Sequence, residues 1–182
     1  MHNDIEKILL THEEIVARCD ELGKQISEDY NAKGETPLLI TLLKGSIPFL
    51  SELMQHIDID GLEYDTMYAT SYEGTESSGT VVIKRDIFTD VKGKSILLVD
   101  DILDTGRTLQ KIRDVMLDRG AKDVKIAALL LKEERRIVKD LHPDYVGFVV
   151  PNEFVVGFGL DYEQKYRNLP FIGVLKKEIY GS

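Results

Sequence analysis

Four short runs of almost purely apolar residues constrain the fold of this chain more than any other feature. They are LLITLL (38–43), ILLV (96–99), VKIAALLL (124–131) and YVGFVV (145–150). Such runs are typical of strands that are covered on both faces, as in a parallel sheet. Segments with apolar residues at helical spacing separate several of these runs, so strands alternate with helices. The pattern predicts an open, mostly parallel, twisted α/β sheet flanked by helices.

Three helices are expected, one before the first of these strands and two between successive ones. Residues 11–30 have apolar positions at helical spacing, and Thr11 and Glu14 have the spacing of a capping box. A second helix is predicted from Ile47 to about His56, and a third runs along Leu109, Ile112, Val115 and Met116 to a stop near Gly120. These helices would supply the layers that cover the sheet.

The segment between residues 62 and 87 has a different pattern. Residues 62–70 alternate as in a strand with two unlike faces, and VVIKRDI (81–87) resumes a strand pattern. The polar, glycine-punctuated stretch 71–81 lies between them and is expected to be a long mobile loop.

Composition restricts the class of protein. A chain of 182 residues fits one domain, and no apolar run is long enough to suggest a membrane span. The one cysteine leaves no disulfide framework, and no secretory signal is evident, so we expect a cytoplasmic protein. The net charge of −9 argues against broad contact with nucleic acid or membranes. A phosphorylated ligand would therefore need local attraction or a metal ion.

The stretch ILLVDDILDTGRTL (96–109) carries the clearest chemical signal. Its apolar run leads directly into two neighbouring carboxylates, Asp100 and Asp101. In an open parallel sheet, ligands collect beyond the carboxyl ends of the strands, which is where this pair is expected. Carboxylates only accept hydrogen bonds, so the pair suits neighbouring sugar hydroxyls or a hydrated divalent cation.

The turn that follows, residues 104–108, offers the opposite chemistry. It supplies backbone N–H groups, two hydroxyls and the start of a helix, and Gly106 allows close approach to a ligand. Nucleotide triphosphatases and receiver domains also end a strand in two acids. A nucleotide triphosphatase lacks support here, because the candidate phosphate loop 74–80 has Thr where lysine is needed. A receiver domain would place its acidic pair near the start of the chain, whereas here the pair lies in the middle. A sugar phosphate suits residues 100–108 better than either alternative.

LLVDDILDTGRTL (97–109) closely resembles the phosphoribosyl pyrophosphate (PRPP) motif of the type I phosphoribosyltransferases. Four further segments resemble, in the same order, the hypoxanthine-guanine phosphoribosyltransferases: LLKGSIPF (42–49), SYEGTESSGTV (71–81), LLLKEERR (129–136) and residues 151–175. The resemblance implies one phosphoribosyltransferase domain over residues 1–182. Its core would span about 35–150, and a small hood would be built from the N-terminal segment and about 151–182.

The resemblance also implies the reaction. A ring nitrogen of a 6-oxopurine would displace pyrophosphate from C1 of PRPP, with Mg²⁺ as cofactor, in a homodimer or homotetramer. Metal is expected on physical grounds too, because a hard cation offsets the repulsion between polyanionic PRPP and an acidic protein. The four histidines show no ligand spacing, so no zinc is assigned.

Roles for single residues follow from the same resemblance. Asp104 is the candidate general base, although Asp at this position would also suit a helix N-cap. Asp100, Asp101 and Asp161 are the candidate metal ligands. The 5′-phosphate and ribose would contact Asp100, Asp101, Asp104, Thr105, Gly106, Arg107 and Thr108.

The remaining roles concern pyrophosphate, the purine and a lid. Lys44, Gly45 and Arg167 would bind pyrophosphate, and an unusual peptide geometry is expected at Lys44-Gly45. Ser71 and Tyr72 would anchor a lid formed by the 71–81 loop. The purine would contact Lys132, Phe154, Val155 and Asp161, with Lys132 donating to the 6-oxo group.

Two departures from the family pattern bear on base preference. Asn152-Glu153 precede Phe154 where a basic residue is common, and Glu133-Glu134 follow Lys132 where less acidic residues are usual. The sequence therefore leaves open an enzyme that prefers guanine or xanthine. A nucleotide-sensing regulator that binds RNA uses the same fold, but the acidity of this chain and its Asp104 argue against that alternative.

Overall fold

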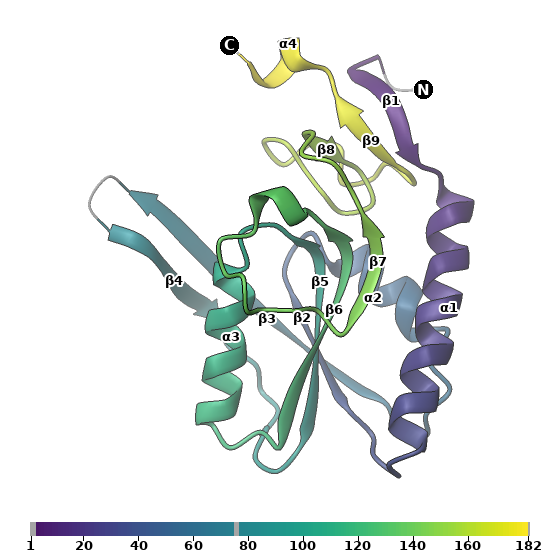
Figure 1. The fold of residues 1–182 in the computed structure, drawn as a ribbon, viewed down its shortest axis with the longest axis vertical. Coiled ribbons are helices and arrows are strands. Elements are labelled where there is room, and N and C mark those ends of the chain that lie inside the picture. Colours follow the sequence, from purple (N-terminus) through teal and green to yellow (C-terminus); the bar gives the residue numbers. More distant parts are fainter. Residues whose placement is uncertain (1–2, 75–76, 182) are drawn as a thin grey trace.

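The computed structural model describes residues 3–74 and 77–181, and its centre is a six-stranded sheet in the order β4-β3-β2-β5-β6-β7 (Figure 1). The strands are β2 (Leu38–Leu42), β3 (Glu63–Gly74), β4 (Ser77–Arg85), β5 (Ser95–Leu103), β6 (Asp123–Leu131) and β7 (Tyr145–Val149). Neighbouring strands are parallel except β3 and β4, which pair antiparallel. The predicted open, mostly parallel sheet is confirmed.

Helices cover both faces of this sheet (Figure 1). Leu39 and Leu97 pack on the face shared with α1 (His12–Asn31) and α2 (Ile47–Met54). Leu38 and Ile96, their neighbours in the chain, pack on the opposite face with α3 (Arg107–Asp118). Because side chains alternate along a strand, a run that is apolar at every position can fill both cores.

Helix α1 begins as its sequence predicts. The Thr11 side chain accepts a hydrogen bond from the Glu14 N–H, and the Glu14 carboxylate accepts one from the Thr11 N–H. This capping box satisfies two backbone donors that a helix start otherwise leaves without partners. The predicted span of 11–30 therefore differs from the observed helix by one residue at each end.

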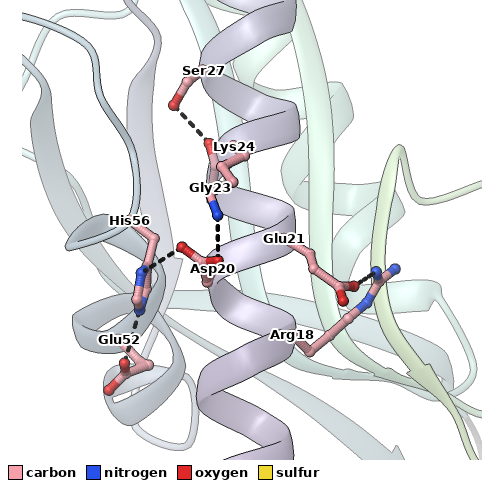
Figure 2. A network of polar contacts seen from close by, with 8 residues as sticks. All are labelled: Arg18, Asp20, Glu21, Gly23, Lys24, Ser27, Glu52 and His56. Atoms are coloured by element: carbon pink, nitrogen blue, oxygen red, sulfur yellow. Dashed lines mark hydrogen bonds and ion pairs between the residues drawn. The ribbon is translucent and has the colours of Figure 1, made fainter.

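Helices α1 and α2 are joined by close packing and a polar network (Figure 2). His56, just after α2, has its ring between Asp20 of α1, at 3.4 Å, and Glu52 of α2, at 3.0 Å. Gly23 permits this approach, since a Cβ there would lie 2.5 Å from the Cβ of His56. The contact fixes α2, whose first turn follows the Lys44-Gly45 loop.

The expected long loop at 71–81 is largely a hairpin. The backbone of β3 continues to Gly74 and pairs with β4 from Ser77, so Ser71 lies opposite Val81 and Tyr72 opposite Thr80. Pairing two polar segments satisfies their backbone N–H and C=O groups. Residues 75–76 lie outside the described ranges.

Strand β5 is longer than the apolar run 96–99 from which it was predicted. It continues through Asp100 and Asp101 to Leu103, because β6 remains paired alongside it as far as Leu131. The acidic pair is therefore part of the strand and not of a loop beyond it. Strand pairing with β6 overrides the local preference of Asp for irregular backbone.

A second, three-stranded sheet forms the hood, in the order β1-β9-β8. Its strands are β1 (Ile5–Leu10), β8 (Val155–Val156) and β9 (Ile172–Leu175), followed by a short helix α4 (Lys177–Tyr180). Both ends of the described chain thus meet in one sheet, with Ile5 opposite Leu175 (Figure 1). Val155, Phe158 and Val174 join the core beneath α1 and α2, which attaches the hood. None of the helices in the described ranges combines the length and hydropathy needed to cross a bilayer.

Candidate active site

A hollow of about 310 Å³ opens at the carboxyl edge of the large sheet. Residues from β5, from the turn before α3, from the loop after β2 and from segment 161–167 line it together. Ten of the predicted site residues belong to this lining: Lys44, Gly45, Asp100, Asp101, Asp104, Thr105, Gly106, Thr108, Asp161 and Arg167. The acids and the turn at 104–108 therefore share one cavity.

The two neighbouring carboxylates are desolvated near the carboxyl end of β5. Burial raises the pKa of Asp100 well above its usual range, and the charge of Asp101 raises it further. Burial also raises the pKa of Asp101 to about 6, although hydrogen bonds to its carboxylate and the charge of Arg167 act in the opposite direction. Two acids that repel each other in a desolvated site favour a cation or hydroxyl donors beside them.

The turn at 104–108 presents free backbone donors to the hollow. Gly106 has a φ of 84°, the left-handed conformation that glycine adopts most easily, and it is the N-cap of α3. Gly106 has no side chain with which to cap this helix. The Arg107 N–H points to the Thr105 hydroxyl, but those of Thr108 and Leu109 have no partner among the described residues and remain available to an anion. The Thr105 carbonyl accepts hydrogen bonds from the N–H groups of Ile137 and Val138, which hold the turn.

Asp104 is not the cap of this helix, contrary to one of its two predicted uses. Its Oδ1 instead accepts a hydrogen bond of 2.6 Å from Nε of Arg135, which lies in the short 3-10 helix η1 (Glu133–Arg135). Arg107, a predicted phosphate ligand, is exposed and does not line the hollow. Its N–H group points back to the Thr105 hydroxyl at 3.4 Å.

The loop after β2 comes into very close contact with the acidic pair. A Cβ at Gly45 would lie 1.8 Å from Oδ2 of Asp101, so any side chain there would displace the Asp101 carboxylate. An unusual peptide geometry was predicted at Lys44-Gly45. The structure has a cis peptide bond one position earlier, between Leu43 and Lys44. The loop packs in turn on Gly159, where a Cβ would lie 1.9 Å from the Gly45 carbonyl oxygen.

Segment 161–167 closes the side of the hollow that faces the hood. Arg167 pairs with Asp161 at 2.9 Å and donates to the Gly159 carbonyl at 2.7 Å. Gln164 also lines the hollow, and its side chain accepts from Arg167 at 3.2 Å. Gln164 was not predicted as a site residue. It adopts a left-handed backbone, φ 65°, at a position where glycine or asparagine would be the usual signal.

Of the four predicted purine residues, Asp161 lines this hollow, whereas Lys132, Phe154 and Val155 do not. Lys132 is buried, and its ammonium donates to the Glu153 carbonyl at 2.7 Å. Burial lowers the pKa of Lys132. Phe154 stacks on Tyr180 of α4, with ring centroids 4.7 Å apart, and Val155 pairs with Val174 inside the hood sheet. The side chains of Ser71 and Tyr72 lie outside what the structure describes, so their lid role remains a prediction.

No group of three or more His, Cys, Asp or Glu side chains able to hold a metal occurs among residues 3–74 and 77–181. This arrangement is compatible with Mg²⁺, which typically takes one or two carboxylates and completes its coordination with water and substrate phosphates. Asp100 and Asp101, whose desolvation favours a nearby cation, supply that kind of donor.

Comparison with known proteins identifies the family of this chain. The family described as phosphoribosyl transferase domain matches residues 6–163. The chain belongs to the phosphoribosyltransferase family. Hypoxanthine-guanine phosphoribosyltransferase from Streptococcus pneumoniae is 51% identical over 183 residues, covering 100% of this chain and 99% of its relative. The Lactococcus lactis protein of the same name is 54% identical, covering 98% of this chain and 95% of that relative.

Solved structures give the same family relationship. A hypoxanthine phosphoribosyltransferase from Staphylococcus aureus superposes with a TM-score of 0.94 at 44% identity, covering 100% of this chain and 97% of that one. The similarity therefore extends over the core, the hollow and the hood of this phosphoribosyltransferase.

Proposed function

We propose that this protein is a purine salvage enzyme that transfers the 5-phosphoribosyl group of PRPP to hypoxanthine, and also to guanine. The products would be IMP or GMP and pyrophosphate. One observation carries the proposal: two desolvated carboxylates and an uncapped helix start line the same hollow, in a chain with full-length similarity to phosphoribosyltransferases. Acceptors for ribose hydroxyls and donors for a phosphate are thereby provided within one site.

The donor substrate would be aligned across the hollow. The 5′-phosphate would bind the N–H groups at the start of α3, and the ribose hydroxyls would reach Asp100 and Asp101. Pyrophosphate would lie between Lys44 and Arg167, whose forked guanidinium suits phosphate oxygens. Arg167 is paired with Asp161 in the structure, so binding would require that pair to share or exchange partners. Alignment and fixed charge are the main sources of rate in such a displacement.

Mg²⁺ would be held by Asp100, Asp101 or Asp161 together with oxygens of the substrate. When bound, the ion would neutralise charge on the departing pyrophosphate. The need for a cation is supported by the acidity of the chain, whose net charge is −9, and by the repulsion within the carboxylate pair.

The purine would bind beside the general base. Asp104 would accept the proton of the purine ring nitrogen as that nitrogen bonds to C1. Lys132 donates a hydrogen bond to the Glu153 carbonyl, but an ammonium carries three donors, so a second would remain for the 6-oxo group. Phe154 would offer a ring for stacking, and the backbone of Val155 would read the purine edge.

We further propose a cytoplasmic homodimer or homotetramer. The single cysteine, Cys19, is buried and free, which suits a reducing compartment. The assembly state and the lid role of Ser71 and Tyr72 follow from the family resemblance.

The test is to incubate the protein with PRPP, Mg²⁺ and one purine at a time and to measure pyrophosphate release. Release is expected with hypoxanthine and guanine but not with adenine, whose amino group offers no acceptor to Lys132. Turnover of xanthine alone would identify a different base preference. Turnover of uracil alone would overturn the purine assignment, and RNA binding without turnover would identify a regulator.

Asp104→Asn provides the matched variant. It removes the proton acceptor while keeping the shape of the side chain, so turnover should fall by roughly 100-fold or more. PRPP binding should persist, because the backbone donors of the turn are unchanged. Wild-type turnover in Asp104→Asn would remove Asp104 from the base role.

A further inference from the structure

The backbone on both sides of Asp104 is held by one segment, residues 132–138. The N–H of Lys132 donates to the Leu103 carbonyl at 3.0 Å. The N–H groups of Ile137 and Val138 both donate to the Thr105 carbonyl, at 3.0 and 3.1 Å. The segment therefore fixes the residue before Asp104 and the residue after it.

Segment 132–138 is itself held by a buried arginine. Arg136 is 7% exposed, and its guanidinium donates to the carbonyls of Lys139 and Leu141, each at 2.7 Å. The same guanidinium pairs with Glu133 at 2.9 Å. Because charge-assisted hydrogen bonds in a desolvated site are strong, this arginine makes the segment a firm support.

Arg135 extends from the middle of this support to the side chain of Asp104. Its Nε donates to Oδ1 at 2.6 Å. Within the described residues, no hydrogen bond reaches the other oxygen, Oδ2, and the capping position of α3 belongs to Gly106. One carboxylate oxygen is thus held while the other stays open on a residue that lines the hollow.

We propose that Arg135 is a positioning residue for the reaction. By holding Oδ1 of Asp104, it fixes the plane of the carboxylate so that Oδ2 faces the purine ring nitrogen. In the step, the nitrogen bonds to C1 as the bond from C1 to pyrophosphate breaks, and its proton passes to Oδ2. Arg135 keeps its own protons throughout. This inference rests on the proposed role of Asp104 as general base.

A role of the Arg135–Asp104 pair in stability can be distinguished from a role in positioning the base. Arg135 and Asp104 have side chains that are 46% and 36% exposed, and ion pairs with this much solvent contribute little to stability. Replacement of Arg135 should therefore leave the fold intact. If the pair positions the base, the loss must appear in kcat, and it must depend on Asp104.

The experiment compares Arg135→Gln, Asp104→Asn and the double variant under saturating PRPP, Mg²⁺ and hypoxanthine. Arg119→Gln is the control, because Arg119 forms a similarly exposed pair with Asp86, at 2.6 Å, away from the residues that line the hollow. Arg135→Gln should lower kcat by roughly tenfold, with the KM for PRPP unchanged. The double variant should be no slower than Asp104→Asn, and Arg119→Gln should match the wild type.

The outcomes separate this inference from the function on which it rests. Wild-type kcat in Asp104→Asn would overturn the base role, and the inference with it. A slow Asp104→Asn beside a wild-type Arg135→Gln would overturn the inference alone. So would a double variant in which the two losses multiply, because Arg135 would then act independently of Asp104.

Discussion

The position of Asp101 in the hollow lowers the stability of the folded protein. Burial raises its pKa from an ordinary 3.8 to about 6, so the folded protein holds this proton more tightly than the unfolded chain does. Stability is therefore lost as pH rises from about 4 to 6, and the full penalty applies above that range. The ionised carboxylate is destabilising at neutral pH in the absence of a ligand.

Asp101→Asn should consequently make the ligand-free protein more stable and less active. We expect a gain on the order of 1–3 kcal/mol at pH 8, since a pKa change of one unit corresponds to about 1.4 kcal/mol. Urea unfolding at several pH values with a chelator present measures the gain, which should shrink below pH 6. A loss of stability at pH 8 would show that the carboxylate is paired more favourably than its burial implies.

Asp65 has the opposite electrostatic balance. Partial burial alone would raise its pKa, but hydrogen bonds from Thr89, Thr66 and Phe88 outweigh this effect and lower the pKa. Its Oδ2 accepts from the N–H of Phe88 at 2.8 Å and from both the N–H and the hydroxyl of Thr89 at 2.9 Å. The carboxylate thus ties the segment after β4 to β3.

Asp65→Asn should destabilise the protein by about 1–3 kcal/mol at neutral pH, because its donors lose a charged acceptor. The lowered pKa means that the stabilisation is present above the ordinary pKa of Asp and is lost as pH falls through the folded value. Denaturant unfolding of the variant and the wild type should therefore converge in acid. Asp60→Asn, at an exposed position, is the control and should change little.

At the scale of elements, the contact between α1 and α2 reverses a general expectation. Replacing a glycine within a helix by alanine usually stabilises the helix by about 0.5–1 kcal/mol. A Cβ at Gly23, however, would lie 2.5 Å from both the Cβ and the carbonyl oxygen of His56. Gly23→Ala should therefore lower the unfolding temperature in a thermal melt, whereas Gln25→Ala on the exposed side of α1 should not.

Elements were predictable where the signal lay in adjacent residues. The apolar runs predicted β2, β5, β6 and β7, and Thr11 with Glu14 marked the start of α1. The strands at 62–70 and 81–87 were expected, but their continuation to Gly74 and from Ser77 was missed, because polar segments that pair only with each other have the composition of a loop. The length of β5 was also missed, since it depends on the pairing of a neighbouring strand.

The same distinction holds for the candidate site. The acids and the turn at 104–108 are neighbours in the chain, so their shared hollow could be predicted from one stretch of sequence. The partners of Lys132, Phe154 and Asp104 are Glu153, Tyr180 and Arg135, each at least 21 residues away. Contacts of this kind depend on tertiary packing, and no local pattern indicates them.

At the scale of the whole molecule, the hollow joins layers that are otherwise separate. Its lining comes from the large sheet on one side and from segment 161–167 near the hood on the other. A ligand that spans it would hold the two together, and at 100 times its Kd would stabilise the fold by about 2.7 kcal/mol.

PRPP with Mg²⁺ should therefore raise the unfolding temperature far more than Mg²⁺ alone. The reason is that the described residues contain no group of three or more His, Cys, Asp or Glu side chains that could hold a metal without substrate. Ribose 5-phosphate with Mg²⁺, which would occupy only the turn and the acids, should give an intermediate shift. Equal stabilisation by Mg²⁺ alone, measured in the same thermal scan, would contradict the two-carboxylate site.

The pairing of β1 with β9 also orders events during synthesis. Residues 5–10 emerge from the ribosome before the large sheet, and their partner strand, 172–175, is made more than 160 residues after them. Through that interval the first strand has an unpaired edge, while the large sheet can already assemble from residues 38–149. Translation therefore completes the hood sheet last, because β9 is made after the large sheet and after every residue that lines the hollow.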